Sequence, residues 1–307
     1  MKKVCCFIIL TIQCLLSGCI RQDIEDCPSL RVRLEVKDKN YFNIDQVEAH
    51  TGLDHRVSED LSFSSYVDRL YYALYREGET EPCLVQHLYE PLEEQAVHEL
   101  LFPQELPFGE YKLVVWGNID TEQGIEYDGK PYTYRLHGEH QEGYDVYMGS
   151  LSLTYNHAKA DYVLPLERVK GKLLIEVVDM PNEVRLSYKE ITHLYEEVDA
   201  RWEYSGNEQV HTLEHWNYGQ RHALTDTYLS PTDQHADSEV RIVFVKGTDE
   251  QSPIVQSALT KIQMKRNKIT VLRYEYDVDI DTEGFNIYLL VDDHWTLIHD
   301  MDVEETR

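Results

Sequence analysis

The chain has 307 residues, with 29 lysines and arginines against 56 aspartates and glutamates, and its formal net charge is -27 at pH 7. Such an acidic surface repels phosphate backbones and anionic lipid headgroups, so it excludes nucleic-acid binding and membrane attachment through basic patches. With 42% hydrophobic and 11% aromatic residues, the chain can bury the cores of two domains of ordinary size.

The N-terminal eighteen residues have the pattern of a secretory signal. Lys2 and Lys3 precede an apolar run from Val4 to Leu16 that is too short to span a bilayer. The run leads into Leu-Ser-Gly-Cys, ending at Cys19, and this tetrapeptide resembles the lipobox of bacterial lipoproteins, whose cysteine receives a diacylglyceryl group. At about 0.8 kcal/mol per buried methylene, two or three acyl chains make release from a membrane negligible. We therefore expect residues 1–18 to be removed and Cys19 to be the lipidation site; the alternatives are an ordinary cleaved signal and a retained short anchor.

Residues 19–29 are polar and acidic and cannot bury enough apolar surface to fold alone, so we interpret them as a tether. Asp23, Glu25 and Asp26 resemble the signal that sends Bacteroidales lipoproteins to the outer face of the outer membrane, although a solvated linker has the same composition. No later stretch reaches the ~18 consecutive apolar residues of a transmembrane helix. The expected location is therefore the cell outer membrane, with lipid as the anchor and the body exposed at the surface.

Two cysteines stay unassigned once the signal and the lipid are counted. Of six cysteines, three lie in the signal and one is Cys19, which leaves Cys27 and Cys83. In an exported protein these two can form a disulfide or stay as thiols, and their spacing does not decide between the two states.

Alternation of apolar and polar residues with a period of two predicts strands through most of the first half. In contrast, residues 93–102 place Ala96, Val97, Leu100 and Leu101 at helical spacing, which predicts one short helix or turn across a sheet end. The expected strands are Leu30–Val36, Tyr66–Tyr75, Cys83–Tyr89, Leu106–Asn118, Tyr132–His137, Leu151–Tyr155 and Ala160–Leu166.

A boundary is expected near Pro165–Gly171, where a new alternation begins. It separates an N-terminal domain, residues 30–167, from a C-terminal domain, residues 168–307. Many short strands without intervening long helices predict an all-β chain of antiparallel sandwiches. The strands expected in the second half are Lys172–Val178, Glu190–Tyr204, Val240–Lys246, Ile254–Met264, Lys268–Ile280 and Phe285–Val291.

Two motifs have catalytic or metal-binding spacing, but neither is good evidence for an enzyme or a metal site. His211-Thr212-Leu213-Glu214-His215 matches the H-x-x-E-H pattern of inverted zinc peptidases, but flanking glycines and asparagines leave room for little more than two helical turns. Asp277, Asp279, Asp281 and Glu283 resemble a calcium loop, but hydrophobic residues separate them and the glycine is misplaced. We therefore expect no enzyme, no catalytic residue, no metal, no cofactor and no small-molecule substrate.

Several landmarks together resemble the FimB-type fimbrial anchor lipoproteins of Bacteroidales, and the resemblance covers essentially the full chain. One departure is residues 71–77, which read Tyr-Tyr-Ala-Leu-Tyr-Arg-Glu where that family usually has an aspartate-containing strand end. The landmarks are Cys19-Ile20-Arg21, Asp26-Cys27-Pro28, Leu30–Val36, Leu106–Asn118 with Gly109-Glu110-Tyr111 and Val115-Trp116-Gly117-Asn118, and Asn286-Ile287-Tyr288 to Asp293-His294-Trp295.

The resemblance implies two tandem transthyretin-like β-sandwich domains and the role of a minor fimbrial subunit. Such a subunit attaches the base of a fibre to the outer membrane and limits its polymerisation; its partners are fimbrial stalk or accessory subunits. Fibres of this kind assemble by strand exchange, in which a segment of one subunit completes the open sheet of the next. A subunit lipidated at Cys19 keeps its first strand and so takes part in one junction only. For that junction we expect the C-terminal segments Phe285–Val291 and Trp295–Met301 to supply the contacting strand, unless they merely close the second sandwich.

Two other classes fit parts of the sequence. A surface glycan-binding lipoprotein of a polysaccharide-uptake system also combines a lipobox, an acidic tether and tandem sandwiches, and 22 tyrosines and four tryptophans could stack on sugars. A lipid-tethered hydrolase would depend on the histidine motif alone. The fimbrial interpretation is preferred because it accounts for the whole length of the chain.

Overall fold

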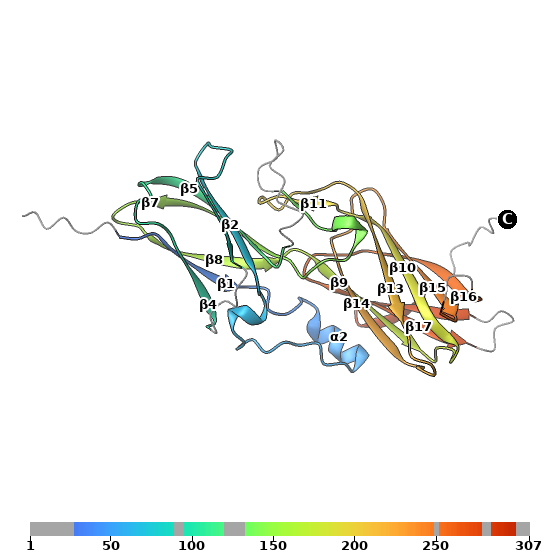
Figure 1. Cartoon of the computed structure of the whole chain (residues 1–307). Coiled ribbons are helices and arrows are strands. Elements are labelled where there is room, and N and C mark those ends of the chain that lie inside the picture. The colour runs from blue at the N-terminus through green and yellow to red at the C-terminus, as the bar shows by residue number, and fades with distance from the viewer. Residues whose placement is uncertain (1–27, 89–94, 120–132, 249–251, 278–283, 299–307) are drawn as a thin grey trace, which may run out of the picture.

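The computed structural model describes residues 28–88, 95–119, 133–248, 252–277 and 284–298, in which strands dominate. Figure 1 shows an elongated molecule with the early strands at one end and the late strands at the other. The all-β class expected from the sequence is confirmed.

The first sandwich is one seven-stranded sheet that folds back on itself. β7 and β8 pair only at Tyr147–Arg168 and Met148–Glu167. The two layers on either side of this short junction enclose a common core that includes Leu34 and Leu113. In sheet order the strands are β3 (Leu84–Leu88), β2 (Leu70–Arg76), β5 (Gly109–Gly117), β7 (Tyr147–Tyr155), β8 (Asp161–Arg168), β1 (Arg31–Val36) and β4 (Val97–Leu101).

β4 replaces the short helix expected over residues 93–102. Its residues 97–101 pair antiparallel with β1, so that Val97 faces Glu35 and Leu101 faces Arg31. The apolar positions fit either period over so short a segment, and pairing with the edge of β1 decides in favour of the strand. The helix prediction was therefore wrong, although residues 93 and 94 lie outside the described part.

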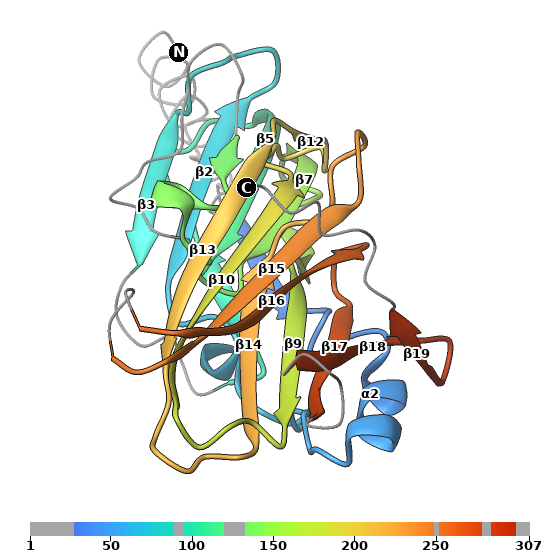
Figure 2. The same cartoon turned by 90° about the vertical axis from the view of Figure 1, so that its right-hand side faces the viewer.

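The second sandwich packs a four-stranded sheet against a five-stranded one, as Figure 2 shows. Their shared core contains Leu173, Ile242, Phe244 and Leu272. The four-stranded sheet has the order β13 (Glu208–His215), β10 (Val184–Leu194), β15 (Ser238–Lys246) and β16 (Ile254–Ile262); the five-stranded sheet has the order β14 (Ala223–Leu229), β9 (Gly171–Val178), β17 (Ile269–Asp277), β18 (Gly284–Val291) and β19 (His294–Ile298).

Each sandwich contains one parallel pair in an otherwise antiparallel arrangement. β1 lies parallel to β8 in the first sandwich, and β9 lies parallel to β17 in the second. In both cases the first strand of the sandwich is involved. The prediction of purely antiparallel sheets is corrected by these two pairs. Alternation of side chains along a strand does not distinguish parallel from antiparallel pairing.

A helix that the sequence analysis missed, α2 (Ile44–Thr51), follows β1 in sequence but packs on the second sandwich. Ile44 and Val47 contact a cluster containing Leu174, Ile269 and Val271. The side-chain amide of Asn43 donates to the carbonyl of Ile269 at 2.8 Å and accepts from its N–H at 2.9 Å, as a neighbouring strand would. A left-handed Gly52 with φ of 69° ends the helix.

A segment of the second half likewise packs on the first sandwich. This arm carries β11 (Glu197–Val198) and β12 (Tyr204–Ser205), and β11 pairs with β6 (Tyr134–Arg135) of the first half. Val198 and Ala200 join the apolar cluster on the outer face of β2, β5 and β7. Two short 3-10 turns, Phe63–Ser65 and Gly138–His140, complete the regular structure of the described residues.

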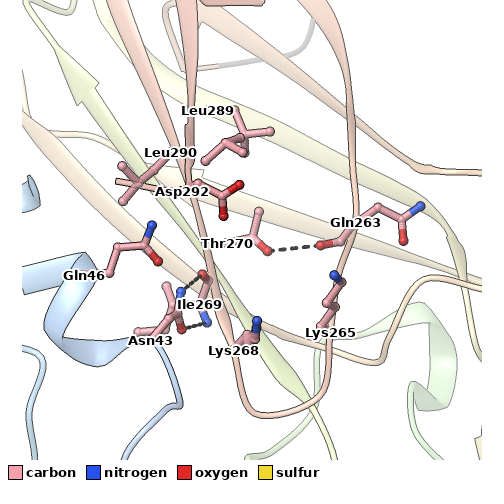
Figure 3. Close-up of a pocket in the computed structure, with 11 residues that line it drawn as sticks. Asn43, Gln46, Gln263, Lys265, Lys268, Ile269, Thr270, Leu289, Leu290 and Asp292 are labelled. Atoms are coloured by element: carbon pink, nitrogen blue, oxygen red, sulfur yellow. Dashed lines mark hydrogen bonds between the residues drawn. The ribbon is translucent and has the colours of Figure 1, made fainter. Parts of the chain in front are cut away.

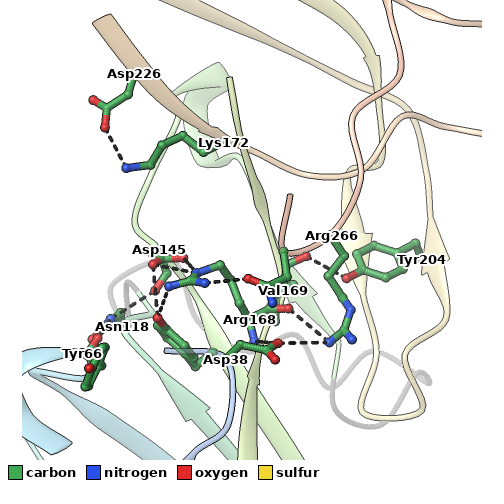
Figure 4. A network of polar contacts seen from close by, with 12 residues as sticks. Asp38, Tyr66, Asn118, Asp145, Arg168, Val169, Lys172, Tyr204, Asp226 and Arg266 are labelled. Carbon is green, nitrogen blue, oxygen red and sulfur yellow. Dashed lines mark hydrogen bonds and ion pairs between the residues drawn. The ribbon is translucent and has the colours of Figure 1, made fainter. Parts of the chain in front are cut away.

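Arg168, at the end of β8, is the centre of the polar contacts between the sandwiches (Figure 4). Its Nε lies 2.9 and 3.0 Å from the carboxylate oxygens of Asp145, and its Nη1 donates to Oδ1 of Asn267 at 2.6 Å. Its backbone N–H donates to Asp38 at 2.9 Å. Three segments far apart in the sequence are thus fixed to one buried residue, two of them through its guanidinium group and one through its backbone N–H.

Candidate functional site

The expected lipidation site, Cys19, lies outside the described residues, which begin at Pro28. The carbonyl of Pro28 accepts a hydrogen bond of 2.8 Å from the hydroxyl of Tyr155, at the end of β7. Arg31 then enters β1 with its N–H bound to the carbonyl of Ala160 at 2.8 Å. The chain is therefore already held by the first sandwich at residue 28, near the end of the expected tether.

Cys83 precedes β3, and its Sγ lies 3.3 Å from the carbonyl oxygen of Leu74. Burial raises the pKa of this thiol, which disfavours the reactive thiolate at neutral pH. Cys27, the other cysteine of the candidate disulfide, lies outside the described residues, so the choice between a bridge and two thiols stays open. Cys83 and Tyr155 both lie close enough to Tyr111 to affect its pKa, and Tyr155 is the residue that holds Pro28. This places residue 83 and the start of the described chain at the same end of the sandwich.

β1 fills an inner position in its sheet. It pairs with β8 along one edge and with β4 along the other. Val32 and Leu34 are fully buried in the core, and Val36 is nearly so, while the arginines and the glutamate between them face outward. Without β1, β4 would lose its pairing partner and β8 would lose a neighbour, leaving a long apolar groove.

The C-terminal strands form an exposed edge of the five-stranded sheet. The strand expected at Phe285–Val291 corresponds to β18. β19 contains residues 295–298 of the segment expected at 295–301, and the rest of that segment lies outside the described part. Asp292 and Asp293 have positive φ angles of 42° and 65° in the tight turn between the two strands. β19 pairs only with β18 in the described structure, so its other edge is open to another strand.

Trp295 fixes β19 to the rest of the molecule. The guanidinium of Arg273 lies 4.1 Å from the centre of its ring, and the side chain packs against the cluster that α2 shares with β17. Beside this cluster is an open pocket of about 200 Å³ between α2, the turn that joins β16 to β17, and the end of β18 (Figure 3). Lys265 and Lys268 lie on one side and Asp292 on another.

The histidine motif falls on a strand. β13 contains His211, Glu214 and His215, so the two histidines share one face of the strand and the glutamate lies on the other. The helix required by an inverted zinc peptidase is replaced by a strand at this position. Within the described ranges, no group of three histidine, cysteine or acidic side chains is placed to hold a metal ion. Of the acidic run near residue 280, Asp277 ends β17 and the three later acidic residues lie outside the description.

None of the helices described is long and apolar enough to cross a membrane.

Comparison with known proteins gives one family. A family model described as fimbrillin-A associated anchor proteins Mfa1 and Mfa2 matches residues 24–300. No curated protein matches the chain.

Solved structures share the fold at low sequence identity. A candidate adhesin of Bacteroides ovatus is 12% identical with a TM-score of 0.56, covering 92% of this chain and 98% of that one. A candidate adhesin of Bacteroides thetaiotaomicron is 11% identical with a TM-score of 0.55, covering 90% of this chain and 100% of that one. A candidate polysaccharide-binding protein of the same species is 11% identical with a TM-score of 0.51, covering 88% and 98%. At these identities the likeness concerns the fold alone.

Proposed function

This chain belongs to the family of fimbrillin-A associated anchor proteins, and from that premise we propose that it is an outer-membrane lipoprotein that attaches the base of a fimbria and limits its growth. The family expected from the sequence is confirmed, and it is a family of fimbrial anchors and not of enzymes. Attachment would run through lipid on Cys19, with the body of the protein at the cell surface and stalk or accessory subunits as its partners.

The observation that carries the proposal is the position of β1. This strand follows the tether directly, is paired on both edges, and places Val32 and Leu34 in the core. Strand exchange needs an unpaired groove in the accepting subunit. A subunit that keeps β1 in place has no such groove in its first sandwich, so a fibre cannot continue through that side.

The exposed edge of β19 is the surface we propose for the remaining junction. It offers unpaired backbone groups along residues 294–298, and the open pocket of Figure 3 lies beside the turn that begins this strand. Truncation after Asp292 should therefore abolish attachment of the fibre while the first sandwich stays folded. The measurement is fibre retention on cells together with limited proteolysis of the purified protein. Unaltered attachment would remove β19 from the interface.

The lipid anchor is tested by Cys19→Ala in the native host, comparing fimbriae on cells with fimbriae shed into the medium. We expect fibres to move to the medium and their length to change, since neither the membrane link nor the terminating subunit would be in place. Cys6→Ala is the matched control, because it replaces a cysteine of the signal without altering the lipobox. If fibres stay on the cells while growth on a polysaccharide fails, the protein serves glycan uptake and the proposal is wrong.

A further inference from the structure

A pocket of about 420 Å³ lies where the two sandwiches meet, on the side of loop 142–145. This volume is within the range of small-molecule sites, which often lie between domains. Most of its lining comes from the first half, and Tyr228 of β14 comes from the second. The remaining lining residues are Ser64, Ser65, Tyr66, Asp68, Asn118, Glu142, Gly143, Tyr144 and Asp145.

Asn118 fixes the walls of this pocket. Its amide nitrogen donates to the carbonyls of Tyr66 and Asp145 at 2.7 and 3.1 Å, and its amide oxygen accepts from the N–H of Asp68 at 3.0 Å. Figure 4 shows Tyr66, Asn118 and Asp145 together beside the Arg168 network. Since the side chain of Asn118 is used in these bonds, it holds the two walls at a set separation.

Loop 142–145, which forms the other wall, is held by a buried lysine. Nζ of the buried Lys170 donates to the carbonyl of Glu142 at 2.6 Å. Gly143 follows with φ of 66°, and a Cβ atom there would lie 3.1 Å from the same Nζ. A glycine is therefore needed at this bend. The pocket is thus preformed by buried contacts and does not depend on a ligand for its shape.

The charges at the pocket are largely neutralised by the protein itself. Asp145 is paired with Arg168, and Asp68 lies 3.4 Å from Nε of Arg69. Burial raises the pKa of Glu142. No lysine or arginine is among the lining residues that the structure describes, and Arg69, beside the pocket, is already paired with Asp68, which disfavours phosphate, sulfate or carboxylate groups. The lining is suited to a ligand without net charge.

The lining also has the mixture of groups that suits hydroxyl-rich rings. It contains no aliphatic side chain among the described residues, and it combines three tyrosines with hydroxyl and carboxyl groups. Tyr144 is 44% exposed, and the guanidinium of Arg69 lies 4.3 Å from its ring centre, which orients the ring. An oriented aromatic face beside hydrogen-bonding groups provides stacking for C–H bonds and partners for hydroxyls.

We propose that this pocket between the sandwiches binds the end unit of a neutral saccharide, with Tyr144 as the stacking platform and Asp68 as a hydrogen-bond acceptor. The site gives the protein a glycan contact at the joint between its sandwiches, in addition to any role in anchoring a fibre. It does not rest on lipidation or on fibre attachment.

The test uses the purified chain without its signal and Cys19 and saturation-transfer NMR with the methyl glycosides of mannose, galactose, glucose, fucose and N-acetylglucosamine. We expect at least one of these to bind, and Tyr144→Ala to weaken that binding about tenfold, as loss of an aromatic stacking contact does. Asp68→Ala should weaken binding of the same ligand, because it removes the proposed hydrogen-bond acceptor. The wall should keep its shape, because the bond from Asp68 to Asn118 is made by the backbone N–H. Tyr218→Ala, at a tyrosine that is 71% exposed and outside the pocket, is the control and should bind normally.

Absence of binding across the panel would overturn the proposal, as would binding that survives both pocket variants. Saturation transfer to lysine methyl ester in place of the glycosides would also overturn it, because the pocket would then take a cationic side chain. Fibre retention on cells carrying Tyr144→Ala separates this inference from the anchoring function: we expect retention to be normal whether or not the saccharide binds.

Discussion

Arg168 connects the two halves of the chain through one side chain. Its guanidinium contacts Asp145, Asn267 and the hydroxyl of Tyr147, which lie in both halves of the chain. The group is almost fully buried, and Asp145 raises the pKa of Arg168 above its already high value. Both charges are thus retained inside the protein only as a pair.

Replacing Arg168 with methionine should lower the free energy of unfolding by about 3–5 kcal/mol, because Asp145 would be left as an unpaired buried charge. Urea denaturation followed by tyrosine and tryptophan fluorescence measures this change. Arg201→Met, at an exposed arginine paired with Asp199, is the matched control and should leave the midpoint nearly unchanged. Equal midpoints for the two variants would show that the Arg168 network adds no stability.

Lys170 predicts a pH dependence of stability. Burial lowers its pKa from 10.5 to about 7, although Asp145 and Glu142 act in the opposite direction. Between these two values the unfolded chain binds a proton that the folded chain does not, so stability rises with pH through this window. Burial lowers the pKa of neighbouring His137 well below 6.5 and that of Lys189 below its usual value, so both act in the same direction.

Lys170→Met should therefore be more stable than the native chain at pH 6–7, and the difference should shrink towards pH 10. Denaturation midpoints at several pH values test this, with Lys268→Met as the exposed control that should follow the native profile. A difference that grows with pH would mean that the lysine is charged and stabilising in the fold.

None of these buried polar contacts was foreseen from the sequence. The partners of Arg168 are up to 130 residues away, and a charged residue at a strand end gives no sign of its burial. Arg168 and Lys170 lie within the boundary predicted near 165–171, a segment whose composition is that of a solvated linker. Only the folded chain brings Asp38, Asp145 and Asn267 to this position.

At the level of elements, the strands with clear alternation were predicted best. β1 and β8 lie where their alternation placed them, because one face of each is buried. β18 also lies where it was expected, as does β5, whose continuous apolar run is buried on both faces. β13 and β14 were not predicted. β13 is mostly polar, and its histidines and glutamate match the spacing of a metal-binding motif. α2 was not predicted, although Ile44, Val47 and the terminal Gly52 fit a helix. A helix of eight residues with two buried side chains gives only a weak periodic signal in the sequence.

The contribution of β1 is measured by Leu34→Ala. This side chain is fully buried, and its truncation should cost about 2–5 kcal/mol of unfolding free energy. Leu101→Ala lies on the paired strand β4 but is 63% exposed, so it should cost little and serves as the control. A small loss for Leu34→Ala would mean that β1 contributes little to the first sandwich, and the growth-limiting role proposed for it would lose its basis.

At the level of the molecule, the two sandwiches exchange packing elements. α2 from the first half covers the second sandwich, and the arm with β11 and β12 covers the first. Alternation along single strands does not contain this information, because it reports which face is buried but not against which partner. Extensive apolar contact of this kind couples the unfolding of neighbouring units.

We therefore expect one calorimetric transition for the native chain. Val198→Asp should divide it into two, because a carboxylate at this fully buried position would detach the arm from the outer face of β2, β5 and β7. Glu203→Gln, on the exposed part of the same arm, should keep the single transition. Two transitions in the native chain would show that the sandwiches unfold independently.

The parallel pairing of β1 with β8 has a mechanical consequence for the anchoring role proposed above. Figure 1 shows both strands running from the far end of the first sandwich towards the second. A pull on the tether acts at the start of β1, whereas tension from the second sandwich enters at the end of β8. The two strands are then drawn in opposite directions along their length, and their hydrogen bonds resist in shear and break together instead of one at a time. Because rupture under force follows the unfolding rate, this geometry would slow detachment in flowing liquid more than overall stability indicates.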